Sequence, residues 1–116
     1  MDEEMLKAAG IDYDMALERF VGNRAIYESF LKKYISDTHV QDASAAYKAV
    51  DYRGMLEQVH ALKGIAGTLG LNELYRISAD IVNNLRTESY DCLEEKLKAL
   101  RCEHERMTQL LQKCQG

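Results

Sequence analysis

None of the 116 residues is proline, and this absence limits the possible folds more than any other feature of the sequence. Proline favours turns and interrupts helices, so a chain without it can stay helical over long stretches. The sequence also contains only 7 glycines and few β-branched residues, which are the other residue types that weaken helices. We therefore predict an all-α fold.

The length and charge of the chain argue against several classes of protein. At 116 residues the sequence is expected to form one domain, residues 1–116. Its net charge of −4, without a basic patch that carries aromatic residues, argues against a nucleic-acid partner. No apolar run approaches the roughly 20 residues of a membrane span, and the acidic N-terminus does not have the features of a signal peptide. We expect a cytoplasmic monomer that contacts no membrane.

The three cysteines, Cys92, Cys102 and Cys114, do not form a Cys-x-x-Cys pair. Neither a zinc site nor a dithiol redox motif is therefore indicated. An odd number of cysteines without an export signal fits a reducing compartment. We predict that the chain holds no metal.

Apolar residues recur at helical spacing in four segments, which are residues 24–49, 52–69, 73–88 and 90–113. The first segment is either one long helix or two stacked helices, because its pattern weakens at Asp37-Thr38-His39. Its apolar stripe is expected to comprise Ile26, Tyr27, Phe30, Leu31, Tyr34 and Ile35. Short connections predict antiparallel neighbours. The expected architecture is an up-and-down four-helix bundle over about residues 23–113, with a short N-terminal helical cap over about residues 1–22.

Polar residues that favour helix N-termini precede most of the predicted helices. They are Asp12, Asn23, Asp51, Asn72 and Ser89. Gly10 and Gly70 stand where a short leading helix and the helix of residues 52–69 are expected to end. The helix boundaries are thus predicted from local signals.

Residues 52–69 form the segment on which the functional interpretation depends. At about 100° per residue, its apolar side chains fall on one arc, made of Met55, Val59, Leu62, Ile65, Ala66 and Leu69. The opposite face carries His60 with Leu56, Lys63, Gly64, Gly67 and Leu71. Each glycine inside a helix costs roughly 1 kcal/mol relative to alanine. Two glycines beside an outward histidine therefore suggest that another molecule approaches it closely.

The spacing of these residues resembles the histidine-containing phosphotransfer (HPt) family of two-component signalling. The pattern His-x-x-Lys-Gly, followed by a small residue and a glycine near the helix end, is matched by His60, Lys63, Gly64, Gly67 and Gly70. The earlier segment Gly10-Ile11-Asp12, with Ala16-Leu17-x-Arg19-Phe20-x-Gly22, also resembles the front of HPt domains.

The resemblance implies a phosphorelay intermediate that accepts and donates a phosphoryl group through His60. Its partners would be histidine kinases and the aspartates of response-regulator receiver domains. The chain itself has no phosphate-cradling glycine loop, so we expect no ATP binding and no kinase activity of its own. We also expect no cofactor, since the receiver domain would supply the Mg²⁺.

The residue types around His60 suit this chemistry. A neutral imidazole nitrogen is a competent nucleophile near neutral pH, because its ordinary pKa is about 6.5. Lys63, three residues further on, can offset the charge of the phosphoryl oxygens. Gly64 removes a side chain where the partner must close over His60. Gly67 serves either partner access or close helix packing.

Some HPt proteins carry an arginine at the position of Arg86, where it supports the phosphorylated histidine, and the resemblance extends this role to Arg86. Several members also have a glutamine that binds the imidazole at the position of Val82. What orients the ring of His60 is therefore open, with Asn83 and Gln58 as possible substitutes.

Leu56 and Leu71 share the predicted face of His60. We expect neither side chain to be fully buried, because an apolar rim around a charged centre is typical of a partner site. We therefore predict that both leucines form a docking rim for the receiver domain.

Three alternatives remain. The chain could be a helical adaptor that binds receiver domains without phosphotransfer. It could be a phosphotransfer domain from a chemotaxis or hybrid histidine kinase, although the initial Met and the helical ends favour a free-standing protein. A metal or haem bundle is disfavoured because His60 lacks the inward carboxylate ligands of such bundles. His39 and His104 are expected to be ordinary surface residues.

Overall fold

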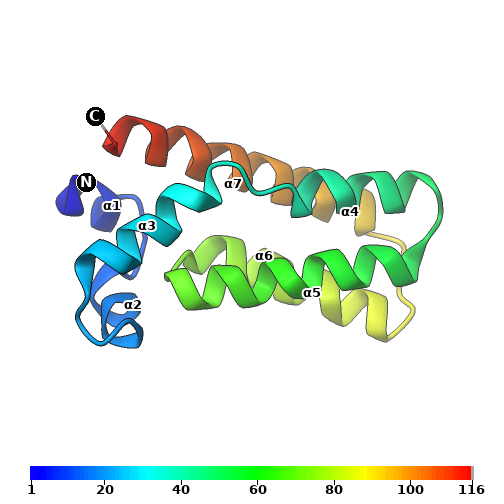
Figure 1. The fold of residues 1–116 in the computed structure, drawn as a ribbon. Coiled ribbons are helices and arrows are strands. Elements are labelled where there is room, and N and C mark those ends of the chain that lie inside the picture. The colour runs from blue at the N-terminus through cyan, green and yellow to red at the C-terminus, as the bar shows by residue number, and fades with distance from the viewer. Residues whose placement is uncertain (116) are drawn as a thin grey trace.

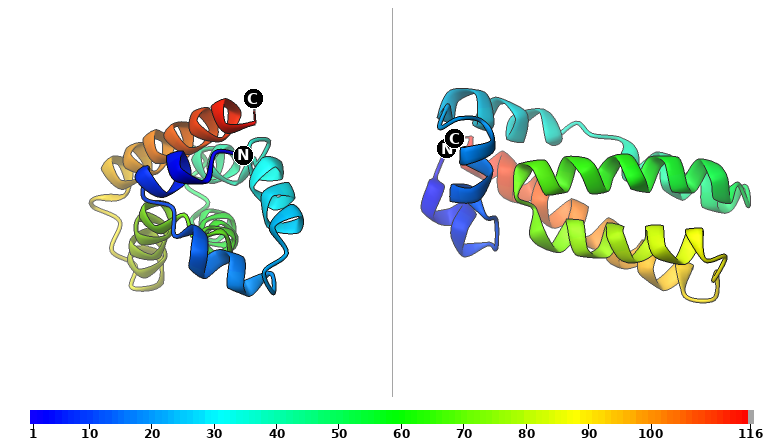
Figure 2. Two further views of the ribbon diagram at one scale, coloured as in Figure 1. Left: turned by 90° about the vertical axis from the view of Figure 1, so that its left-hand side faces the viewer. Right: turned by 90° about the horizontal axis from the view of Figure 1, so that it is seen from below.

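The structure is a computed structural model that describes residues 1–115, and this part of the chain contains seven α-helices (Figure 1). They are α1 Glu3–Ala8, α2 Tyr13–Arg19, α3 Arg24–Tyr34, α4 His39–Lys48, α5 Tyr52–Leu69, α6 Asn72–Arg86 and α7 Leu93–Cys114. The prediction of an all-α fold is confirmed. Both ends of the described chain lie at the same end of an elongated molecule, with α1 against α7 (Figures 1 and 2).

The long helices pack in a ring, with α5 against α4 and α6, and with α7 against α6 and α4. The pair α5 and α6 runs antiparallel along the length of the molecule (Figure 2). The segment 24–49, which the sequence left as one helix or two, is two helices, because α3 ends at Tyr34 and α4 begins at His39. The Asp37 carboxylate accepts the backbone N–H of His39 at 2.9 Å, and such a local side-chain bond competes with helix continuation.

The core is formed by the faces that the helical spacing predicts. On α5 the buried side chains are Met55, Val59, Leu62, Ala66 and Leu69, and on α6 they include Leu74, Ile77, Ser78, Ile81 and Leu85. Ile65 differs from the prediction, since it is only partly buried against the core. Its exposure follows from the break at Ile35–Thr38, because α3 makes few contacts with α5 and leaves this flank open.

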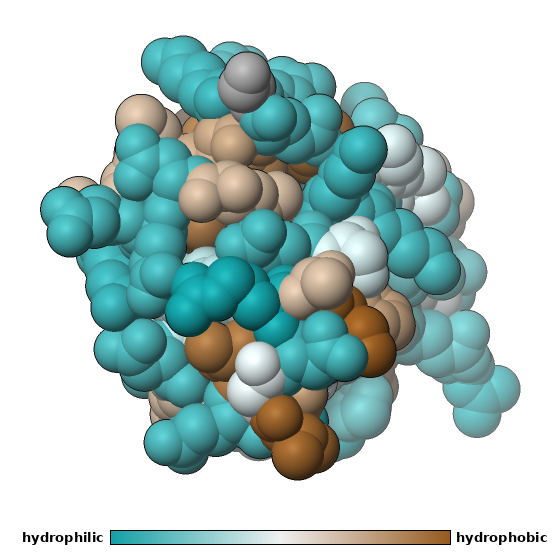
Figure 3. Space-filling view, turned by 60° about the vertical axis from the view of Figure 1, so that its left-hand side comes forward, coloured by the Kyte–Doolittle hydropathy of each residue, from teal (hydrophilic) through white to brown (hydrophobic). Residues whose placement is uncertain are grey.

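Several apolar side chains of the N-terminal third are exposed, and two of them belong to the predicted apolar stripe of residues 24–49. Ile26 is 47% exposed and Phe30 is 45% exposed, so only part of that stripe faces the core. Met5, Met15 and Val21 are exposed as well. In Figure 3, which brings this end of the molecule forward, brown apolar atoms stand between teal polar ones.

The N-terminal helices dock on the C-terminal end of α5 by binding its free carbonyl groups. The last carbonyls of a helix have no partner within it. The hydroxyl of Tyr27 donates to the carbonyl of Leu69 at 2.7 Å, and the N–H of Asp12 donates to the carbonyl of Gly70 at 2.9 Å. Gly70 has a φ of +76°, and a Cβ there would lie 2.6 Å from the Asp12 oxygen. This position therefore requires glycine.

Three of the five predicted helix caps are confirmed, since the side chains of Asp12, Asn23 and Asp51 accept backbone N–H groups in the first turns of α2, α3 and α5. The other two were wrong. Asn72 is the first residue of α6, and α7 starts only at Leu93. Ser89 instead belongs to the connection, where its carbonyl accepts the side-chain amide of Asn84 at 3.0 Å.

Within residues 1–115, no helix combines the length and the apolar character needed to cross a membrane. The same residues contain no cluster of three or more histidine, cysteine, aspartate or glutamate side chains that could hold a metal ion.

Candidate functional site

His60 is exposed on the middle of α5, on the side opposite the buried face of this helix. Its neighbours one turn before and after, Leu56 and Lys63, are partly buried, and Gly64 is exposed. The predicted outward placement of the imidazole is therefore confirmed. An exposed imidazole in the middle of a helix can be reached by a second macromolecule without any opening of the fold.

The imidazole borders a shallow hollow of about 370 Å³ built by three helices. Its walls are Arg19 from α2, Tyr75 from the first turns of α6, and His60, Lys63, Gly64, Gly67 and Thr68 from α5. Two of these residues are cations and none is a carboxylate. The hollow thus suits an anionic group brought by another molecule.

Arg19 enters the hollow because it binds the end of α5. Its guanidinium donates to the carbonyl of Gly67 and lies 3.9 Å from the sulfur of Met15. The carbonyl of Gly67 is free for this contact, because the N–H of Leu71 donates to Ala66 instead, at 2.9 Å. The sequence placed Arg19 in the front motif, but helical spacing gave no sign that it lies beside His60.

Tyr75 is the second residue of the hollow that the helical spacing of residues 52–69 does not predict. Its ring lies against Gly67, where a Cβ would come within 3.3 Å of two ring carbons. The ammonium of Lys63 lies 5.8 Å from the centre of the same ring, within the range of a cation–π contact. Of the two uses left open for Gly67, the geometry therefore favours close packing.

Gly64 differs from Gly67 in its surroundings. No heavy atom lies within 4 Å of the position that a Cβ would occupy on Gly64. Packing inside the chain therefore does not require glycine here. The absent side chain leaves open space directly beside His60, at a site where glycine weakens the helix.

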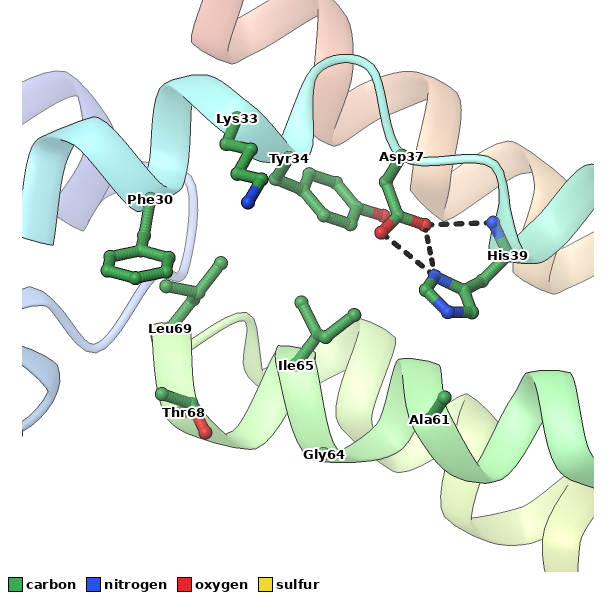
Figure 4. Close-up of a pocket in the computed structure, with 10 residues that line it drawn as sticks. All are labelled: Phe30, Lys33, Tyr34, Asp37, His39, Ala61, Gly64, Ile65, Thr68 and Leu69. Carbon is green, nitrogen blue, oxygen red and sulfur yellow. Dashed lines mark hydrogen bonds and ion pairs between the residues drawn. The ribbon is translucent and has the colours of Figure 1, made fainter.

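A larger groove of about 620 Å³ lies on the other side of Gly64, between α3 and α5 (Figure 4). It is lined by Phe30, Lys33, Tyr34, Asp37, His39, Ala61, Gly64, Ile65, Thr68 and Leu69. Most of this lining is apolar, and the Asp37 carboxylate holds the His39 ring through Nδ1 at 2.9 Å. Gly64 and Thr68 border both the groove and the hollow, so the two depressions meet beside His60.

The prediction for Leu71 was wrong, because its side chain is only 1% exposed. The prediction extended the helical phase of α5 beyond its end, but the left-handed Gly70 turns the chain. Leu71 then forms an antiparallel bridge with Ile11 and points into the core. Leu56 is partly buried against the core, as expected for a residue that is not fully covered.

Arg86 does not line the hollow of His60. It is the last residue of α6 and is exposed. Counted from the turn at Gly70, His60 lies level with about residue 81, so Arg86 stands roughly 7 Å further along the helix pair. Val82 is 2% exposed and faces the core, so it cannot orient the imidazole, while Asn83 is exposed on α6.

The expectation that His104 is a surface residue was also wrong. Its Nδ1 lies 2.6 Å from the hydroxyl of Tyr34, and the ring is half-buried. Burial lowers the pKa of His104 below its ordinary value. Burial likewise raises the pKa of Tyr34. The pair ties α3 to α7 and belongs to the support of the fold.

A family model described as Hpt domain matches residues 34–113. The match begins at the last residue of α3 and includes the whole of α4, α5 and α6 with most of α7. It leaves α1, α2 and nearly all of α3 outside. No curated protein and no solved structure matches the chain.

Proposed function

Since the chain belongs to the Hpt domain family, whose members transfer phosphoryl groups through histidine in phosphorelays, we propose that it is a phosphorelay intermediate that works through His60. The observation that carries this proposal is the exposed imidazole beside the open space of Gly64. Hpt domains are phosphotransfer modules without kinase activity of their own. The phosphoryl group would therefore come from histidine kinases by way of receiver-domain aspartates, and return to such aspartates.

The transfer itself is a displacement at phosphorus. A neutral ring nitrogen of His60 attacks the phosphorus of the receiver's aspartyl phosphate. The new N–P bond forms as the acyl O–P bond breaks, and the aspartate leaves as a carboxylate. Receivers bring the Mg²⁺ that neutralises the oxygens, so this chain needs no cofactor of its own. The reverse sequence returns the phosphoryl group to a second receiver.

Lys63 and Gly64 would support this reaction from the same helix. The ammonium of Lys63 lies one turn from His60 and can offset charge on the phosphoryl oxygens. Gly64 would let the partner's backbone approach. Gly67 would let the Tyr75 ring pack closely against α5, where the ring contacts the ammonium of Lys63. Arg86 would act only when its long side chain extends back along α6. Leu56 remains the proposed apolar docking contact.

In this proposal α4–α7 form the four-helix bundle that presents His60, and α1–α3 form its cap. The protein would act as a single domain and as a monomer in the cytoplasm. Its binding surface is the face of α5 that carries the hollow and the groove.

The test is incubation with a receiver domain phosphorylated on its aspartate. Acid-labile label should appear on the wild-type protein and be absent from His60→Gln, while His104→Gln, at a residue that lines neither the hollow nor the groove, serves as the control and keeps the label. Because His60 is exposed, the His60→Gln variant should retain its helical content and melting temperature. Binding of the receiver without any label would instead identify an adaptor without phosphotransfer.

A further inference from the structure

The hollow beside His60 has one wall that comes from outside the segment matched by the family model. Arg19 belongs to α2, whereas the match covers residues 34–113. The N-terminal cap therefore adds a charged group to the face that a partner must cover. Arg19 lies outside the His-x-x-Lys-Gly arrangement but belongs to the front pattern that resembles HPt domains, and at this place its charge can discriminate between partners by the charge that they present.

The charge around Arg19 is uncompensated inside the hollow. Its neighbours there are Lys63, His60 and uncharged residues, and no carboxylate is among them. Glu18 precedes Arg19 on α2, but it does not line the hollow. An anionic group that covers this face would thus meet two cations at once.

The guanidinium of Arg19 is held in position before any partner arrives. One of its nitrogens donates to the carbonyl of Gly67, and another lies near the sulfur of Met15. A guanidinium has five N–H donors, so donors remain for a carboxylate while the contact to α5 persists. A side chain that is already fixed loses less entropy on binding than a free one.

We propose that Arg19 is a specificity-determining residue that pairs with a carboxylate at the rim of the receiver's phosphoryl-accepting pocket. Lys63, one turn from His60, then offsets the charge of the phosphoryl oxygens. This inference rests on the proposed function, because it takes the occupant of the hollow to be a receiver domain. Receivers with an acidic residue at that part of the rim are selected, and receivers with a basic residue there are rejected.

The experiment compares Arg19→Gln, Arg19→Lys and the control Arg101→Gln with the wild type. Arg101 is exposed on α7 and lies outside the hollow. Because it is also an arginine, its replacement by glutamine makes the same change in net charge. The probe is a purified receiver domain chosen from a panel by its binding to the wild type. Dissociation constants are measured at several salt concentrations, with KM and kcat for transfer, and a thermal melt of each variant records any loss of the contact to Gly67.

Arg19→Gln is expected to raise the dissociation constant and KM roughly three- to tenfold at low salt, because a rim charge acts mainly on encounter. The difference should shrink towards 1 M salt, where charges are screened within about 3 Å. Arg19→Lys should keep most of the affinity, and kcat at saturating receiver should change less than KM.

Two results would overturn the inference while leaving the proposed function intact. One is a dissociation constant for Arg19→Gln equal to that of Arg101→Gln. The other is a loss of receiver affinity that is equally large in Arg19→Lys and in Arg19→Gln and is independent of salt, which would mean that Arg19 only caps α5. If the wild type binds receivers but is never labelled, the proposed phosphorelay function fails. The ratios of the dissociation constants of the variants to that of the wild type then still decide the role of Arg19. If no receiver binds, both proposals fail.

Discussion

Replacement of Gly64 by glutamine is expected to stabilise the fold and at the same time slow phosphoryl transfer. The backbone at Gly64 is helical, and a new side chain would meet no atom within 4 Å at its Cβ. Glutamine is better than glycine inside a helix by about 0.6 kcal/mol. At roughly 2.1 cal/mol/K of unfolding entropy per residue, a chain of 116 residues should melt about 2 to 3 °C higher.

The cost of the same replacement should appear only with the partner present. The new side chain stands where the hollow and the groove meet, beside His60. In-line transfer tolerates little displacement, because a misplacement of about 1 Å can cost on the order of 100-fold in rate. We expect single-turnover transfer from a phosphorylated receiver to be about 10- to 100-fold slower in Gly64→Gln.

Gly64→Ala gives a graded control for this prediction. Alanine should raise the melting temperature by about 4 °C, since it gains roughly 0.9 kcal/mol over glycine. Its short side chain should slow transfer less than glutamine does. A lower melting temperature in either variant would show that the space is not open. An unchanged transfer rate in Gly64→Gln would show that no partner packs there.

Three further predictions concern the support of the site. Leu71→Asp should lower the free energy of unfolding by several kcal/mol, because it buries an unpaired charge, whereas Leu56→Asp should weaken receiver binding more than folding. Thermal melts and receiver titrations of both variants test this, and an equal fall in melting temperature would contradict it. Tyr27→Phe should lower the free energy of unfolding by about 1 to 3 kcal/mol in urea, because the buried Leu69 carbonyl loses its donor. Burial lowers the pKa of His104, so the unfolded chain binds a proton there more readily than the folded chain, and the wild type should lose stability as the pH falls below about 6.5. His104→Gln should make this loss smaller. Equal slopes of the free energy of unfolding against pH in the two proteins would refute the prediction.

The bounds of α5 could be predicted from the sequence because every signal for them is local. Asp51 binds the N–H of Gly54 in the first turn, and the left-handed Gly70 follows the last turn. The outward placement of His60 followed from the helical period alone. Leu71 marks the limit of that method, since the period has no meaning once the helix has ended.

Features that join distant parts of the chain could not be predicted in the same way. Arg19 and Tyr75 reach the hollow because α2 and α6 meet the end of α5, and no periodicity of α5 contains this information. The exposure of Phe30 has a similar cause, because it depends on α3, which ends before the break at Asp37, making few contacts with α5. Residue patterns within one helix fix its phase, while the neighbours of that helix depend on the whole fold.

Asp12 and Tyr27 bind the last carbonyls of α5 but lie outside the segment that the family model matches. The unit that folds is therefore longer than that segment. A fragment that began at residue 34, where the family match begins, would lose both donors and leave the end of the histidine helix uncovered. Transplanting the phosphotransfer module into another chain therefore requires residues 1–33 as well. Exchange of that N-terminal portion between homologous modules would change the surroundings of the histidine without altering a residue of its helix.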